Sequence, residues 1–88
     1  MCTGITETAL IAGSGKGKDG WFVLDEVNVS YDHPYHAPVE HALNLDFVNS
    51  AAGPGARVAV ELTADSARRL VDTILLALER GAVAEARQ

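Results

Sequence analysis

The sequence is poor in cysteine. Its single cysteine, Cys2, cannot form a disulfide within the chain, and a lone thiol is typical of a reducing compartment. Without disulfides, a chain of 88 residues buries only about 60–65% of the surface that its unfolded form exposes. We therefore expect additional support from a metal ion or from a second subunit.

Basic residues and long apolar runs are also scarce. Seven Lys and Arg residues face twelve Asp and Glu residues, for a net charge of −5, and this acidic balance excludes a nucleic-acid partner. No apolar run reaches the roughly 18 residues of a membrane span, and the start of the sequence lacks the pattern of a signal peptide. We expect a cytoplasmic protein without a nucleic-acid or membrane partner.

Four segments show the two-residue alternation of β-strands, namely 5–12, 21–31, 41–48 and 57–62. The glycine-rich segment 13–20 is predicted to be a mobile loop, because glycine carries a high entropic cost inside a strand. Segment 49–56 contains turn-forming residues. The pattern therefore predicts four strands joined by three connections.

From Thr63 the apolar period changes from 2 to 3.6, which predicts a helix over 63–80. Thr63 is placed to cap its N-terminus, and Gly81 is placed to end it. Residues 82–88 are then expected to be a tail. The apolar stripe of this helix contains Ala67, Leu70, Val71, Ile74, Leu75 and Leu78.

Together these segments predict a single α+β domain over residues 1–88. It consists of a four-stranded antiparallel sheet in the order β-β-β-β-α, with the C-terminal helix packed on one face. The other face carries polar residues such as Asn28, Asn44 and Asp46, which suits solvent, a ligand or a second subunit. We expect a homodimer, formed by sheet or edge pairing, to compensate for the small core.

The stretch "YDHPYHAPVEH" (31–41) contains every histidine of the chain. Imidazole and carboxylate groups are the usual ligands of Zn, Ni, Cu or Fe. The stretch therefore predicts a divalent-metal or small-ligand site. The expected ligands are His33, His36 and His41, with Glu40 or Asp32 as a fourth ligand.

Two other functions remain open for this stretch. A cofactor-independent enzyme would use His41 or His36 as general acid or base, with Glu40 to orient the ring and Tyr35 to stabilise developing charge. A third interpretation is a structural loop at a protein interface, since Asp-His-Pro is common in turns.

The segment "GSGKGKDG" does not fit a nucleotide-binding loop. The Walker pattern requires glycine five positions before the Gly15-Lys16 pair, where Leu10 stands, and a Ser or Thr after Lys16. The segment also precedes a strand, so the positive end of a helix dipole is missing. The role of this segment stays open.

The stretches "YDHPYHAPVEHALNLDFVN" and "GPGARVAVELTADSARRLVDTI", together with "GSGKG" and "GWF", resemble a group of short actinobacterial proteins of unknown function. The resemblance covers most of the chain. It implies a cytoplasmic bacterial protein and assigns a role to no residue.

Overall fold

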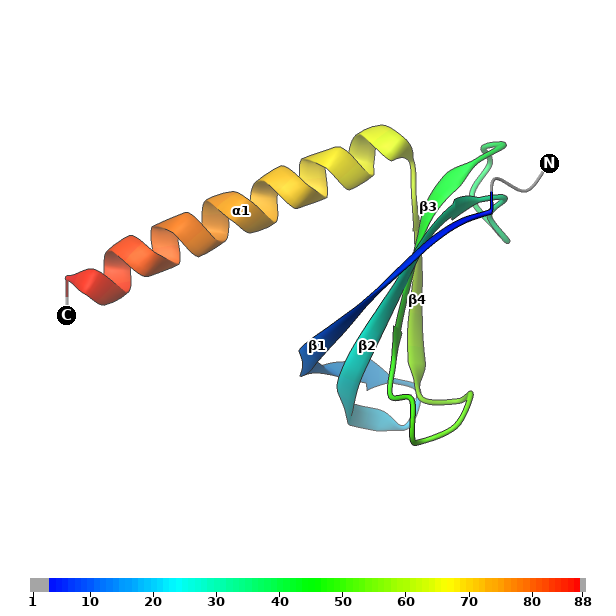
Figure 1. Cartoon of the computed structure of the whole chain (residues 1–88), viewed down its shortest axis with the longest axis horizontal. Helices are drawn as coiled ribbons and strands as arrows, with labels where there is room; N and C mark the ends of the chain where they lie inside the picture. The colour runs from blue at the N-terminus through cyan, green and yellow to red at the C-terminus, as the bar shows by residue number, and fades with distance from the viewer. Residues whose placement is uncertain (1–3, 88) are drawn as a thin grey trace.

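The computed structural model describes residues 4–87, so Cys2 and Gln88 lie outside the described residues. Its elements are β1 (Ile5–Gly17), β2 (Gly20–Asp32), β3 (Ala42–Val48), β4 (Arg57–Leu62) and α1 (Ala64–Ala86). The strands form one antiparallel sheet in the order β1-β2-β3-β4, and the helix follows the last strand (Figure 1). The predicted α+β fold class is confirmed.

The segment 13–20 is not the loop that we predicted. β1 continues through Gly17 and β2 begins at Gly20, so the turn consists of Lys18 and Asp19 alone. Gly20 has a φ of +112°, a conformation that is open to glycine and strained for other residues. The prediction failed because it took glycine only as a source of flexibility.

The glycines of β1 make room for large side chains of β2. A Cβ atom on Gly15 would lie 3.1 Å from the side chain of Leu24, and one on Gly17 would lie 3.1 Å from that of Phe22. Two apolar side chains can therefore lie directly over the neighbouring backbone. The compensation for glycine's poor strand propensity is the packing of Leu24 and Phe22.

A β-bulge separates the two halves of β1. The register with β2 shifts between Leu10 and Gly13, and a bulge bends the strand that contains it. Figure 1 shows the far end of this hairpin turned across the lower end of the sheet.

The register of β2, β3 and β4 separates apolar from polar side chains. Val29 pairs with Leu45, and Leu45 pairs with Val60. Such rows form the apolar sheet face, made of Val27, Val29, Tyr31, Leu43, Leu45, Phe47, Val58, Val60 and Leu62. The residues between them form the polar sheet face, made of Glu26, Asn28, Ser30, Asn44, Asp46 and Glu61.

The helix begins as predicted and ends later. The hydroxyl oxygen of Thr63 accepts a hydrogen bond from the N–H of Ser66 at 3.2 Å, which is the expected N-cap. Gly81 does not end the helix, and the predicted tail continues the helix to Ala86. A glycine inside a helix costs only about 1 kcal/mol, and the alanine-rich residues after it favour helix.

The helix covers little of the sheet. Only its first turns border the apolar sheet face, and the rest extends beyond the sheet (Figure 1). Among the described residues, the hydrophobic side chains that are buried are Leu24 and Ala42 alone. Within residues 4–87, no helix combines the length and apolar character needed to cross a membrane.

The packing over Gly15 can be tested by two substitutions in the same strand. We expect Gly15→Ala to lower the free energy of unfolding by about 1–3 kcal/mol, because its Cβ would crowd the buried Leu24. Gly13→Ala is the matched control, since a Cβ there meets no atom within 4 Å. Urea unfolding measures both, and equal losses would contradict the packing role of Gly15.

Candidate functional site: the histidine loop and the polar sheet face

The histidine loop, residues 33–41, connects β2 to β3. Its ends lie close together because Asp32 pairs with Ala42 across the two strands. The rings of His33 and His41 stack with their centroids 4.9 Å apart. The ring of Tyr31 also stacks on that of His41, with a centroid distance of 5.7 Å. The result is a row of three aromatic rings at the base of the loop.

The carboxylate of Glu61 holds the middle of the loop. It accepts hydrogen bonds from the backbone N–H groups of Tyr35, His36 and Ala37. These donors, with Ala37 the largest influence and Tyr35 next, hold the pKa of Glu61 below its ordinary value of 4.5. The loop is therefore fixed to β4 by one charged side chain.

Further contacts close the two ends of the loop. The N–H of His33 donates to Asp32 Oδ1 at 2.7 Å. The Nδ1 atom of His33 lies 2.8 Å from the backbone oxygen of Glu40. Glu40 thus contacts His33 through its main chain.

The predicted metal ligands are only partly brought together. His33 and His41 are neighbours, whereas the backbone of His36 is held at Glu61. The planes of the two stacked rings differ by 24°, so their in-plane nitrogen lone pairs do not point at one another. Residues 4–87 contain no group of three or more His, Cys, Asp or Glu side chains that could hold a metal ion in this conformation.

The predicted catalytic residues lie in different environments. His41 is half-buried against Tyr31, as expected from its place before the apolar positions of β3. His36, Glu40 and Tyr35 are exposed, and Tyr35 is fully so. Their catalytic role stays a prediction.

Beneath the loop, the polar sheet face forms a hollow of about 530 Å³. Asp32, His33 and Tyr35 form its rim on the loop side. Its floor consists of the polar sheet face and nearby residues, including Thr6, Asn28, Ser30, Asn44, Asp46, Arg57 and Glu61. Residues far apart in the sequence thus meet at one open surface.

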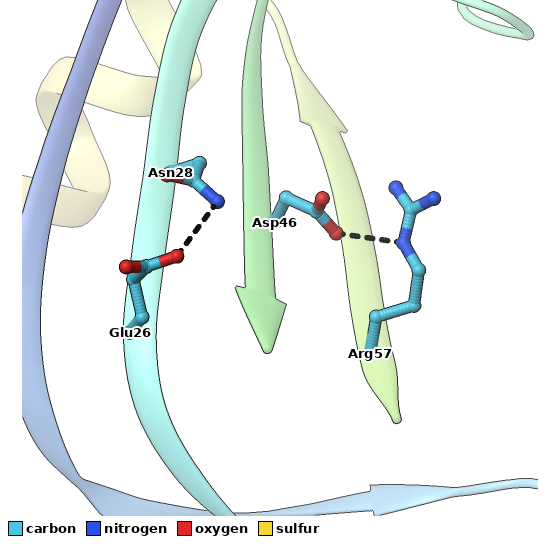
Figure 2. A network of polar contacts seen from close by, with 4 residues as sticks. All are labelled: Glu26, Asn28, Asp46 and Arg57. Atoms are coloured by element: carbon cyan, nitrogen blue, oxygen red, sulfur yellow. Dashed lines mark hydrogen bonds and ion pairs between the residues drawn. The ribbon is translucent and has the colours of Figure 1, made fainter. Parts of the chain in front are cut away.

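Several side chains of this hollow are ordered by contacts with one another or with residues beside the hollow. Arg57 Nε donates to Asp46 Oδ1 at 2.9 Å, and Asn28 Nδ2 donates to Glu26 at 3.4 Å (Figure 2). The hydroxyl of Thr8 donates to Asn28 Oδ1 at 2.6 Å. Figure 2 shows the side chains of four residues projecting from β2, β3 and β4 over the same side of the sheet, namely Glu26, Asn28, Asp46 and Arg57.

The charge of the hollow selects the ligands that it can accept. Asp32, Asp46 and Glu61 supply negative charge, and Arg57 supplies the positive charge among the residues that line it. Because Arg57 already pairs with Asp46, it offers little to an incoming anion. Amide and hydroxyl groups add neutral donors and acceptors. The hollow therefore suits a neutral or cationic hydrogen-bonding ligand.

Comparison with known proteins gives a family but no activity. The model of a family of unknown function, DUF6295, matches residues 1–88. The chain belongs to DUF6295. No curated protein and no solved structure matches the chain. The family match agrees with the resemblance to proteins of unknown function. The candidate site of this DUF6295 chain is therefore inferred from the residues of the chain itself.

Two residues of the candidate site are absent from the sequence-based prediction, namely Glu61 and Arg57. The signal in the sequence was weak: both alternate with Val58, Val60 and Leu62, as solvent-facing residues also do. Their partners, Asp46 and the loop backbone, are set by strand register and not by sequence spacing.

The role of Glu61 predicts a pH dependence. Because its pKa is lower in the folded protein than its ordinary value of 4.5, its contribution to stability is complete above that value and is lost as pH falls through the folded pKa. We expect Glu61→Gln to reduce this acid-side loss and to speed hydrogen exchange at Tyr35, His36 and Ala37. Exchange rates and unfolding curves at several pH values measure both effects.

Glu79→Gln on the exposed surface of α1 is the control for the Glu61 variant. It removes one carboxylate at a distance from the loop. Unchanged exchange at Tyr35, His36 and Ala37 in Glu61→Gln would contradict the anchoring role of Glu61.

Proposed function

We propose that this DUF6295 chain is a cytoplasmic binding protein whose small polar ligand occupies the hollow between the polar sheet face and the histidine loop. The proposal keeps the small-ligand site predicted at the loop and extends it to the sheet beneath. The loop supplies the rim, and the sheet supplies most of the recognition groups.

The observation that carries this proposal is the convergence of polar side chains from four strands and one loop on a single hollow. Its volume of about 530 Å³ lies within the range of roughly 300–1,000 Å³ typical of small-molecule sites. The Asp46–Arg57 pair and the Thr8–Asn28–Glu26 chain of hydrogen bonds fix several of these groups before a ligand arrives. Such preorganisation lowers the entropic cost of binding.

The ligand class follows from the charges. Asp32, which does not share the Asp46–Arg57 pair, favours an amino group, and Ser30, Asn28 and Asn44 can bind hydroxyl or amide groups. Phosphate or carboxylate ligands would meet uncompensated negative charge. We propose a neutral or cationic polar molecule, such as an amine-bearing polyol.

Three probes that share one ring test this class: glucosamine, glucose and glucose 6-phosphate. We expect affinity to decrease in that order, since the added charge changes from positive to neutral to negative. The measurement is NMR titration, with the side-chain NH₂ signals of Asn28 and Asn44 and the Nε–H signal of Arg57 as reporters. Binding of the phosphate alone, or shifts confined to α1, would refute the proposal.

A matched pair of variants locates the binding. Asn44→Ala removes an amide group from the floor of the hollow and should weaken binding about 5- to 100-fold, the effect of losing one or two ligand hydrogen bonds. Ser14→Ala, on an exposed position of β1, should leave affinity unchanged. Equal effects of the two changes would place the ligand elsewhere.

We propose divalent-metal binding as a second function, supported by the proximity of the His33 and His41 rings. A transition metal needs further ligands, which His36, Glu40 or Asp32 would supply after the loop rearranges, or a second copy of the chain would provide. Rotation of the stacked rings is also required, because their lone pairs do not converge in the present arrangement.

Elemental analysis of protein purified without an affinity tag tests the metal proposal. A bound metal predicts close to one equivalent per site and a thermal shift on addition of Zn²⁺ or Ni²⁺, which His41→Ala abolishes. Less than about a tenth of an equivalent, with no thermal shift, would reject it while leaving the polar-ligand proposal intact.

A further inference from the structure

The helix leaves a wide apolar opening beside the sheet. This opening, about 530 Å³ in volume, lies between the apolar sheet face and the first turns of α1. Its walls include Val29, Leu45 and Phe47 on the sheet and Leu70 and Ile74 on the helix. Within residues 4–87, Arg68 is the one charged residue that lines it. Water is a poor occupant of such a surface.

The second half of α1 carries further apolar side chains with no cover. Leu75 and Leu78 are 59% and 65% exposed, and Val83 is 49% exposed. A helix of 23 residues is about 35 Å long, whereas the seven residues of β3 span about 23 Å. The helix therefore extends beyond the apolar sheet face of its own chain (Figure 1).

The connection between the sheet and the helix is a single residue. β4 ends at Leu62 and α1 begins at Ala64, so Thr63 alone sets the direction of the helix. Thr63 is also the N-cap, and its extended conformation is required for capping. With this connection α1 points away from its own sheet beyond its first turns (Figure 1).

The total exposed area gives the size of the missing contact. A folded monomer of 9.3 kDa is expected to expose about 5,000 Å². This chain exposes 6773 Å², which is about 1,800 Å² more than that expectation. If each of two copies covers this extra exposed area of the other, the dimer buries about 3,600 Å² in total, which is within the range of obligate homodimers.

We propose that the occupant of this opening is α1 of a second copy of the chain. In this arrangement each helix lies on the apolar sheet face of the other copy, and the two helices pack against each other about a two-fold axis. The chain carries both halves of such an interface, an unpaired helix stripe and an unpaired sheet face, so the contact is self-complementary.

The charges of the helix permit this pairing. Residues 64–87 contain four acidic and four basic side chains, whereas the whole chain has a net charge of −5. The negative charge is thus concentrated in the sheet half, and two helices can approach without net repulsion. The polar sheet face lies on the other side of the sheet and stays open to its ligand.

Sedimentation equilibrium of the full chain at micromolar concentration tests the proposal. We expect twice the mass of the 9.3 kDa chain. Leu78→Glu should weaken association at least about a hundredfold, since each dimer loses two buried leucines. Leu10→Glu is the matched control: Leu10 is 85% exposed on β1, outside the proposed contact, and its replacement should leave the mass unchanged.

A second measurement identifies the contact even where Leu78→Glu fails to fold. In a mixture of isotope-labelled and unlabelled wild-type chains, NOEs between copies should join Leu75 or Leu78 to Phe47 or Leu45. A folded wild-type monomer, a dimer that survives Leu78→Glu, or inter-copy NOEs confined to the edges of β1 and β4 would each overturn the proposal.

Discussion

From Val27 onward in β2, and throughout β3 and β4, every second side chain is apolar. The antiparallel register aligns these side chains in rows, with Val29 beside Leu45 and Leu45 beside Val60. A shift of one residue in any pairing would place the apolar set of that strand on the polar side. The hollow, the loop anchor and the apolar opening all depend on this alignment. Register thus determines which surface can bind a polar molecule and which must be covered by another helix.

The loop shows how acidic residues near histidines can serve architecture. The carboxylate of Glu61 accepts hydrogen bonds from three backbone N–H groups, so it fixes the positions of Tyr35 and His36. Asp25 acts similarly at the opposite end of the sheet, where it accepts bonds from the hydroxyl and the N–H of Ser50. Hydrogen bonds from Ser50, through its side chain first, lower the pKa of Asp25. Both connections of β3 are therefore tied to the sheet by carboxylates.

Residue patterns predicted the fold class and the start of the helix because alternation and the Thr63 cap are local features. The same patterns failed at Gly15 and Gly17, whose role depends on Leu24 and Phe22 across the strand pair. They failed at Gly81 because the helix propensity of the residues that follow outweighs the cost of one glycine inside the helix. At the site, the histidine cluster indicated the loop, and the proximity of His33 to His41 was within reach of the sequence. The contacts of Glu61 and Arg57 were not, because they cross between strands.

Each strand of the sheet pairs with its neighbour in sequence. Such a meander closes only short loops, so its formation requires little loss of chain entropy and can begin before the chain is complete. The helix follows the sheet in the sequence, so the apolar sheet face can form before α1 covers any part of it. A folding intermediate with a formed sheet and an undocked helix exposes this apolar face, and such intermediates are prone to aggregate.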